Sequence, residues 1–438
     1  MPEASHDAAI TRTSVIHPSL GGRQGRRNGP EALEEAVSLA RAIDLEVRDA
    51  RVLPVKRPRA GTFLGKGQVE ELKFQVASAS IDLVFVDTAL SPVQQRNLEQ
   101  QLQTKVIDRT GLILDIFGAR AATREGVLQV EMAALTYQRS RLVRSWTHLE
   151  RQRGGLGFVG GPGESQLEID RRLIGQRIAR LRRELDGVAA MRGQHRNARS
   201  KAPWPTVALV GYTNAGKSTL FNRLTGAGVY ADDRLFATLD PTMRALDLGR
   251  GMRAILSDTV GFVSDLPETL VAAFRATLEE VTEASLIVHV RNAHHPEHEL
   301  QAADVMAVLA NLGIDELDAS ERMVTVYNKR DMLDDDSASR LHAIVERQGD
   351  AAVISARTGE GLDDLVDLIA RRLAGRQRLV ELSVPVKDGA AIGYLYRHAE
   401  VVERSDGDHD IHLKVRIQAS DLGRFHKHFS RPAPSCRQ

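Results

Sequence analysis

The chain has 438 residues, 42% hydrophobic and 27% charged, as is ordinary for a soluble globular protein of about two to four domains. Its single cysteine, Cys436, excludes a disulfide framework and a cysteine-based zinc site. The net charge is +1, but residues 120–201 carry 17 Lys and Arg against 8 Asp and Glu, a local excess of +9 that favours a polyanionic partner over a merely solvated helix pair. Because no apolar run resembles a membrane helix or a secretory signal, we expect a cytoplasmic protein.

Residues 1–118 alternate apolar strands with amphipathic helices, which is typical of a small parallel α/β domain. The expected strands are 14–17, 45–53, 83–86 and 104–107, and the expected helices are 30–43, 67–76 and 92–102. Gly65-Lys66-Gly67 resembles half of a phosphate loop, but it lacks the full spacing and no Ser or Thr follows the lysine. A structural turn before a helix is therefore favoured there over a second nucleotide site.

Residues 119–201 form the basic block, in which two apolar seams predict an antiparallel helical hairpin. The seams consist of Leu128, Met132, Leu135, Leu142, Trp146 and Leu149, and of Ile174, Ile178, Leu181, Leu185 and Val188. Arginines stand on both helices: Arg139, Arg141, Arg144, Arg151 and Arg153 on the first, and Arg171, Arg172, Arg177, Arg180, Arg182 and Arg183 on the second. We expect the seams to be core and the arginines to contact phosphates.

The connection between the two helices, residues 153–165, is unusually rich in glycine. Six of the ten residues from 154 to 163 are glycine. The same stretch also contains apolar residues, which a loop that faces only solvent does not need. A small backbone with a few packing groups suits a tip that enters a narrow crevice of folded RNA. We expect RNA contacts at Gly154, Gly155, Phe158, Arg172 and Arg180, and the alternative is a plain glycine hinge.

A β-branched run over 207–210 predicts a buried strand, residues 211–218 fit G-x-x-x-x-G-K-[ST], and helical spacing resumes over 220–224. This context predicts a P-loop, which binds a nucleoside triphosphate, in a domain that spans residues 202–375. Backbone N–H groups of such a loop form an anion nest, aided by the positive end of the following helix. Lys217 is expected to reach the β- and γ-phosphates, and Ser218 to hold Mg²⁺.

Two further segments follow in the order that guanine-nucleotide chemistry requires. Within F-A-T-L-D-P-T, residues 236–242, Thr238 is expected to complete the Mg²⁺ shell, and Thr242 is the alternative. A strand over 254–256 leads into D-T-V-G, where Asp258 would hold Mg²⁺ through water and the Gly261 N–H would contact the γ-phosphate. We expect the catalytic residues to be Lys217, Thr238 and Gly261.

The segments that select the base come last. A strand over 323–327 leads into N-K-R-D, whose Asp331 can accept two hydrogen bonds from N1–H and the amino group of guanine. Adenine offers no such pair, so GTP is predicted over ATP, and residues 202–375 are predicted to be a GTPase domain (G domain). A strand over 352–354 leads into S-A-R-T-G, residues 355–359, whose N–H groups can meet guanine O6. Each segment follows the carboxyl end of a strand, where such sheets bind ligands.

Phe262 follows D-T-V-G at the position where many GTPases place the glutamine that orients the attacking water. A phenyl ring can neither donate nor accept that hydrogen bond. We therefore expect slow hydrolysis by the protein alone, and a partner that supplies or orders the missing group.

Residues 376–438 are predicted to be a small α+β module that follows a basic linker over 371–378. Its expected strands are 380–386, 400–403 and 411–417, and its expected helices are 388–397 and 420–428. Before it, His294, His295 and His298 follow a strand over 286–290; a polar helix start is favoured there over a metal site.

The chain closely resembles the HflX-type GTPases over about residues 14–428. The resemblance is carried by the motifs G-Y-T-N-A-G-K-S, F-A-T-L-D-P-T, D-T-V-G-F and N-K-R-D. They are preceded by G-K-G-Q-V-E-E-L and by the tip R-G-G-L-G-F-V-G-G-P-G-E-S. The resemblance implies Mg²⁺ ligation by Ser218 and Thr238, and it includes the hydrophobic residue at Phe262. Arg291-Asn292 departs from it, because relatives often have an acidic residue there. The nucleotide-binding residues that it implies are Gly211, Tyr212, Thr213, Asn214, Ala215, Gly216, Lys217, Ser218, Phe236, Ala237, Thr238, Leu239, Asp240, Asp258, Thr259, Val260, Gly261, Asn328, Lys329, Arg330, Asp331, Ser355, Ala356 and Arg357.

The resemblance also implies a protein that binds the large ribosomal subunit near the peptidyl-transferase centre and splits stalled ribosomes under stress such as heat. Our leading hypothesis is such a GTPase, a monomer off the ribosome that binds GTP or GDP and does not span a membrane. The alternatives are a ribosome-assembly GTPase of the Obg or Era kind and a non-enzymatic RNA-binding module with a vestigial nucleotide site. Intact Lys217, Ser218 and Asp331 speak against the module.

Overall fold

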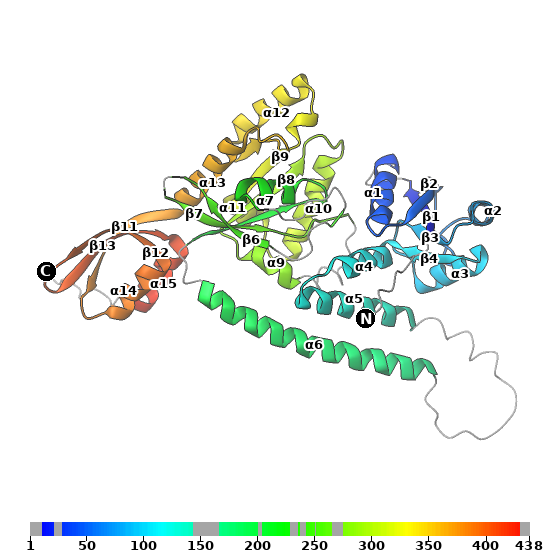
Figure 1. The fold of residues 1–438 in the computed structure, drawn as a ribbon, viewed down its shortest axis with the longest axis horizontal. Helices are drawn as coiled ribbons and strands as arrows, with labels where there is room; N and C mark the ends of the chain where they lie inside the picture. The colour runs from blue at the N-terminus through cyan, green and yellow to red at the C-terminus, as the bar shows by residue number, and fades with distance from the viewer. Residues whose placement is uncertain are drawn as a thin grey trace, which may run out of the picture.

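The computed structural model describes residues 11–21, 29–142, 166–199, 204–227, 235–236, 242–249, 251–264 and 275–429. Three separate sheets, of four, six and three strands, follow one another along the chain. Figure 1 shows the four-stranded and three-stranded sheets at opposite ends of the molecule, with the six-stranded sheet between them. None of the helices in these ranges is long and apolar enough to span a bilayer. The predicted α/β fold class, with a P-loop domain between two smaller units, is confirmed.

The N-terminal sheet is parallel throughout, in the order β2-β1-β3-β4. Its strands are β1 (Arg12–Leu20), β2 (Glu46–Val55), β3 (Leu83–Val86) and β4 (Lys105–Asp108), and its helices are α1 (Gly29–Arg41), α2 (Lys66–Ser78) and α3 (Pro92–Leu102). Each strand and helix expected in this region is present. Val15 and Phe85 pack into one apolar cluster, whereas the neighbouring Ile16 and Val84 pack into another. Both faces of the sheet are therefore covered, which explains strands that are apolar without alternation.

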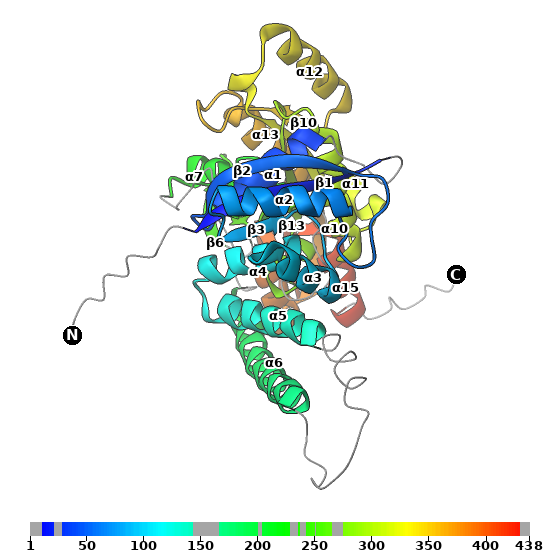
Figure 2. The same ribbon diagram turned by 90° about the vertical axis from the view of Figure 1, so that its right-hand side faces the viewer.

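Three helices lead from this sheet toward the next: α4 (Arg109–Arg120), α5 (Arg124–Leu142) and α6 (Gln166–Arg199). Figures 1 and 2 show α5 and α6 side by side, as the predicted hairpin requires. Leu128, Ile178 and Leu181 of the predicted seams are buried. Trp146, Leu149 and the whole glycine-rich tip lie outside the described residues.

The six-stranded sheet has the order β10-β9-β8-β5-β7-β6, and only β6 is antiparallel to its neighbour. The strands are β5 (Thr206–Gly211), β6 (Thr242–Asp247), β7 (Arg253–Asp258), β8 (Leu286–Asn292), β9 (Met323–Asn328) and β10 (Ala351–Val353). Its helices are α7 (Lys217–Thr225), α9 (Arg275–Thr282), α10 (His298–Asn311), α11 (Glu316–Arg322), α12 (Asp335–Gln348) and α13 (Leu362–Arg376). Strand β6 was not expected from the sequence, because Leu246 alone of its six residues is buried and the strand carries no apolar pattern.

The C-terminal sheet is antiparallel, in the order β11-β13-β12. It contains β11 (Gln377–Pro385), β12 (Ala399–Asp406) and β13 (Asp410–Gln418), with α14 (Gly389–His398) and α15 (Ala419–Phe429), and all five elements were expected. The predicted basic linker over 371–378 is wrong, because α13 ends at Arg376 and β11 begins at the next residue. Leu368, Ile369 and Leu373 are buried, so the helical apolar period continues through the basic residues.

Candidate nucleotide-binding site

The predicted phosphate loop lies between the carboxyl end of β5 and the start of α7. Two of its glycines have no room for a side chain. A Cβ on Gly211 (φ +152°) would stand 2.2 Å from the Val290 carbonyl oxygen, and a Cβ on Gly216 (φ +91°) would stand 2.2 Å from the Asn328 side-chain nitrogen. The glycine pattern of the motif is therefore required by close contacts with β8 and with the last residue of β9.

Lys217 is the first residue of α7 and is buried, with 6% of its surface exposed. Its Nζ donates hydrogen bonds to the carbonyl oxygens of Gly211 (3.0 Å) and Tyr212 (2.8 Å), so the chain curls around the ammonium group. Burial lowers the pKa of Lys217 to about 8, although the nearby Asp258 carboxylate acts in the opposite direction. A phosphate bound at this loop would place negative charge beside the buried Lys217 ammonium group and so stabilise its charged form.

Ser218 and Asp258 provide the oxygen atoms proposed for Mg²⁺. The Ser218 hydroxyl donates to Asp258 Oδ2 at 2.7 Å, and Asp258 is fully buried at the end of β7. A hydroxyl beside a carboxylate, with no sulfur or imidazole, is a donor set that suits Mg²⁺. Thr238 lies outside the described residues, whereas Thr242, the alternative ligand, begins β6 in register with Asp258.

The D-T-V-G-F segment is bonded directly to the phosphate loop. Thr213 N donates to the Phe262 carbonyl at 2.7 Å, and Phe262 N donates to the Gly211 carbonyl at 3.1 Å. Phe262 itself is 1% exposed and belongs to the core cluster that contains Phe117 of α4. Its ring is therefore held in the core, where it cannot orient a water molecule for attack.

The two base-recognition segments are joined to each other and to the phosphate loop. Asn328 donates to the Ala215 carbonyl at 2.8 Å and accepts from Ala356 N at 2.9 Å. The Ser355 hydroxyl donates to Asp331 Oδ1 at 2.6 Å, which holds that carboxylate in place. The structure thus brings four of the five predicted segments together, and 237–241 of the fifth lie outside the described residues.

Phe236, also predicted at the nucleotide site, is buried with its ring 4.6 Å, centroid to centroid, from that of Phe117. Its φ of +58° is rare for a non-glycine residue. The aromatic contact joins the segment after the phosphate loop to α4 of the N-terminal region.

Among the residues that the structure describes, which include His294, His295 and His298, there is no group of three or more His, Cys, Asp or Glu side chains that could hold a metal ion. His298 begins α10, as expected for a polar helix start. A different histidine was missed, His289 within β8, because it stands in an otherwise apolar run. It is 4% exposed, and burial, followed by Arg291 and Lys217, lowers its pKa to about 3.

We expect His289 to make the protein less stable in mild acid. Its folded-state pKa lies below the unfolded value of about 6.5, so the unfolded chain binds the proton first as the pH falls. The free energy of unfolding is then reduced progressively below about pH 6.5, by about 2 kcal/mol at about pH 5. Urea unfolding at about pH 7.5 and pH 5 should show this loss in the unmodified protein and not in His289→Gln. His342→Gln, at an exposed histidine of α12, should retain the loss; an equal loss in His289→Gln would contradict the assignment.

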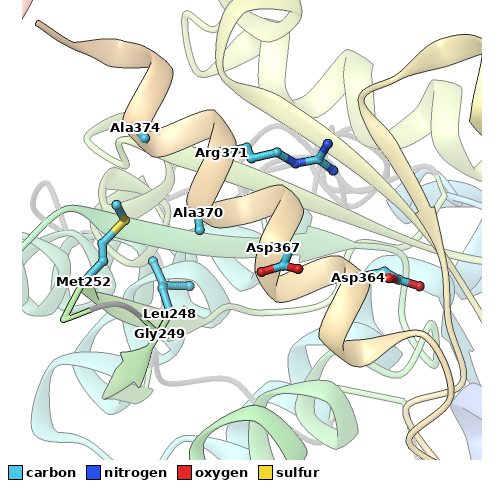
Figure 3. Close-up of a pocket in the computed structure, with 8 residues that line it drawn as sticks. All are labelled: Leu248, Gly249, Met252, Asp364, Asp367, Ala370, Arg371 and Ala374. Atoms are coloured by element: carbon cyan, nitrogen blue, oxygen red, sulfur yellow. The ribbon is translucent and has the colours of Figure 1, made fainter.

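A separate cavity of about 440 Å³ lies between the turn joining β6 to β7 and helix α13. Figure 3 shows Leu248 and Met252 on the side of α13 that carries Ala370 and Asp367. None of its lining residues belongs to the predicted nucleotide site. The cavity is therefore a surface feature distinct from the phosphate loop.

Known families match nearly the whole chain. Residues 30–118 match a family described as GTP-binding GTPase N-terminal, 120–199 its middle region, 206–329 a 50S ribosome-binding GTPase, and 341–432 the HflX C-terminal domain. GTPase HflX of Magnetococcus marinus is 51% identical, covering 90% of this chain and 89% of its own. GTPase HflX of Escherichia coli is 44% identical, with 91% and 92% covered. Among solved structures, a GDP complex of a protein called SsGBP matches with a TM-score of 0.49 and 22% identity, over 82% of this chain and 98% of that one. The 51% and 44% sequence identity with the two HflX relatives, over about nine-tenths of the chain, shows that the protein belongs to the HflX family of GTPases.

Proposed function

We propose that this GTPase binds the large ribosomal subunit in the cytoplasm and dissociates stalled or idle ribosomes, especially under stress. The observation that carries the proposal is a guanine-nucleotide site on the same chain as a long basic hairpin. The match of residues 206–329 to 50S ribosome-binding GTPases and the HflX relatives support the same partner. GTP binding would favour docking, and hydrolysis would favour release.

The second helix of the hairpin, α6, offers a positively charged surface suited to ribosomal RNA. Its arginines at 171, 172, 177, 180, 182 and 183 are all exposed, so their charges face solvent. Arg177 also pairs with Glu131 of α5 (2.7 Å), which fixes the two helices together. Arg141 is not available for RNA, because it is ion-paired with the buried Asp108 at 2.7 Å. Arg172 and Arg180 remain the proposed phosphate contacts, with Gly154, Gly155 and Phe158 at the tip; Arg180 pairs with Glu184 at 2.9 Å, but this pair lies at the surface.

In the proposed reaction the chain stabilises charge rather than forming a covalent intermediate. The Lys217 ammonium and the N–H groups of the phosphate loop bind the β- and γ-phosphate oxygens, and Gly261 N–H binds the γ-phosphate. Mg²⁺, held by Ser218, Thr238 and through water by Asp258, would neutralise the phosphates. Because Phe262 cannot orient water, we propose that the large subunit supplies or orders that group.

GTP turnover with and without purified large subunits tests this proposal. We expect the subunits to increase turnover by at least about tenfold, since an ordered water or an added positive charge contributes strongly to phosphoryl transfer. Fast turnover by the protein alone would contradict the role given to Phe262. Sedimentation separates the alternatives: dissociation of intact ribosomes supports splitting, whereas binding only to immature particles supports an assembly factor.

Replacing residues 154–163 with a short Gly-Ser turn should abolish ribosome splitting and leave GTP binding unchanged. The physical reason is that the packing residues of the tip would be lost while the G domain is untouched. Splitting is measured by the shift of intact ribosomes to separate subunits in a sucrose gradient. Splitting that survives the replacement would show that the tip is not the working part.

Arg172→Glu combined with Arg180→Glu should weaken binding to large subunits and make it less sensitive to salt. For each phosphate contact that is removed, binding releases about one counterion fewer from the RNA. The slope of log affinity against log salt concentration should therefore decrease in magnitude by about two. The matched control is Arg340→Glu with Arg347→Glu on α12, where both arginines are exposed. An equal change in both double variants would indicate a general charge effect instead of contacts by α6.

A further inference from the structure

A buried polar cluster lies where the N-terminal region meets the G domain. It consists of Glu35 on α1, Asp87 after β3, Arg109 at the start of α4, Tyr212 in the phosphate loop and Ser264, two residues after Phe262. We call these five residues the Arg109 cluster. Asp87, Arg109, Tyr212 and Ser264 are buried, and the Glu35 side chain is 11% exposed. The interactions of such a cluster are strong because water is largely excluded.

Arg109 is the centre of the cluster. Its guanidinium donates to Glu35 and Asp87, and also to Ser264 of the G domain, at the carbonyl oxygen (3.1 Å) and the hydroxyl (2.9 Å). Burial by itself would lower the pKa of Arg109, but Asp87 and Glu35 outweigh it and raise this pKa well above its ordinary value. The charged guanidinium group of Arg109 therefore links Ser264 to two carboxylates of the N-terminal region.

Tyr212 provides a second attachment to the same serine. Its hydroxyl donates to Glu35 and accepts a hydrogen bond from Ser264 N at 2.7 Å. The Ser264 hydroxyl lies 3.1 Å from Glu35 Oε1. One carboxylate of α1 therefore contacts both the phosphate loop and the segment that follows D-T-V-G-F.

This attachment fixes Gly261 as well, because only two residues separate it from Ser264 and one of them, Phe262, is bonded to the phosphate loop. Gly261 lies close to the loop: an added Cβ would stand 2.8 Å from Thr213 Cγ2 and 3.1 Å from Lys217 Nζ. In the function proposed above, the γ-phosphate accepts hydrogen bonds from both Gly261 N–H and Lys217. It has to enter between these two groups, so Gly261 has to withdraw from Lys217 and take residues 262–264 with it.

We propose that Glu35, Arg109 and Tyr212 are positioning residues that hold residues 261–264 against the phosphate loop and thereby set the preference for GDP over GTP. The N-terminal region then senses the γ-phosphate through Ser264. Phe117 of α4 contacts Phe236, so a second segment of the G domain packs against the same helix. The inference rests on the proposed γ-phosphate contacts of Lys217 and Gly261.

Tyr212→Phe tests the inference because it removes one hydroxyl and keeps the ring in the core. Without its bonds to Glu35 and Ser264, withdrawal of Gly261 becomes easier. The ratio of affinity for a β–γ imido analogue of GTP to affinity for GDP should rise about three- to tenfold. Glu35→Gln should act in the same direction. In the double variant the effects should fall short of additivity, since both changes break the same hydrogen bond. Both affinities are measured by calorimetry on the full chain.

Tyr137→Phe is the matched control, because its hydroxyl also donates to a buried carboxylate, Asp108, but this carboxylate belongs to the N-terminal region. It should leave the affinity ratio unchanged. An unchanged ratio in Tyr212→Phe and Glu35→Gln, or equal shifts for both nucleotides, would overturn the inference while leaving the proposed function intact. Failure of the unmodified protein to bind either nucleotide would overturn the proposed function itself.

Discussion

Replacing Lys217 with alanine is expected to reduce kcat/KM for GTP by about a thousandfold or more. The ammonium group is the one buried cation that the described part of the phosphate loop provides, and such groups catalyse phosphoryl transfer chiefly by stabilising the charge that develops in the transition state. The variant also leaves the Gly211 and Tyr212 carbonyl oxygens without their donor, so the loop itself should lose its shape. Phosphate release with saturating large subunits measures the effect.

Lys66→Ala is the matched control for Lys217→Ala. Lys66 stands in Gly65-Lys66-Gly67, the segment that resembles half of a phosphate loop, but the structure places it exposed at the start of α2 with Gly65 as the helix cap. Removing its charge should leave GTP turnover within about twofold of the unmodified protein, because surface substitutions have small effects. A large loss in Lys66→Ala would mean that the N-terminal region takes part in nucleotide chemistry. Normal turnover in Lys217→Ala would refute the site.

Asp331→Asn should weaken GTP binding by at least about a hundredfold and should improve binding of xanthosine triphosphate. A carboxylate accepts from guanine N1–H and the amino group, whereas an amide would present a donor to that amino group and leave polar groups unpaired. Xanthine has a carbonyl oxygen in place of the amino group, which an amide N–H can reach. The Ser355 hydroxyl can still donate to the side chain at position 331, so the local geometry should persist.

Competition between the guanine, xanthine and adenine triphosphates measures this change of specificity. Asp336→Asn, at an exposed carboxylate of α12, should leave all three affinities unchanged. If Asp331→Asn retained guanine binding, base selection would have to come from another group. The backbone N–H groups of Ser355 and Ala356 would be the next candidates.

Much of this fold was predictable because the strands are apolar runs that end in short motifs. The boundaries of β3 and α3 match the expected 83–86 and 92–102, since Leu83–Val86 is wholly apolar and Ser91 caps the helix at Pro92. The motif residues Lys217, Asp258 and Asp331 could be found because each lies at the carboxyl end of a recognisable strand or shortly after it. Prediction from the sequence pattern is wrong where the spacing of apolar residues and the charge of the segment point to different structures. Strand β6 was missed because it is polar, and the end of α13 was predicted to be a linker because it is basic, although one face of it is buried.

The Arg109 cluster could not be predicted from sequence for a different reason. Arg109 and Glu35 are 74 residues apart, and Arg109 and Ser264 are 155 apart, so no local spacing joins them. In the sequence Arg109 is one more arginine at a helix start, and Glu35 is an ordinary acidic residue on an amphipathic helix. Their meaning depends on the packing of α1 and α4 against the phosphate loop. Tertiary contacts of this kind become visible only when the chains of distant elements are placed in space.

The direct passage from α13 into β11 has a mechanical consequence. A flexible linker would let the C-terminal sheet move independently of the G domain. A helix that is followed directly by a strand instead couples the orientation of the sheet to that of the helix. Leu368 and Leu373 anchor the other face of α13 in the core of the G domain. We therefore expect the orientation of the C-terminal sheet to follow that of α13, and so that of the six-stranded sheet on which α13 packs.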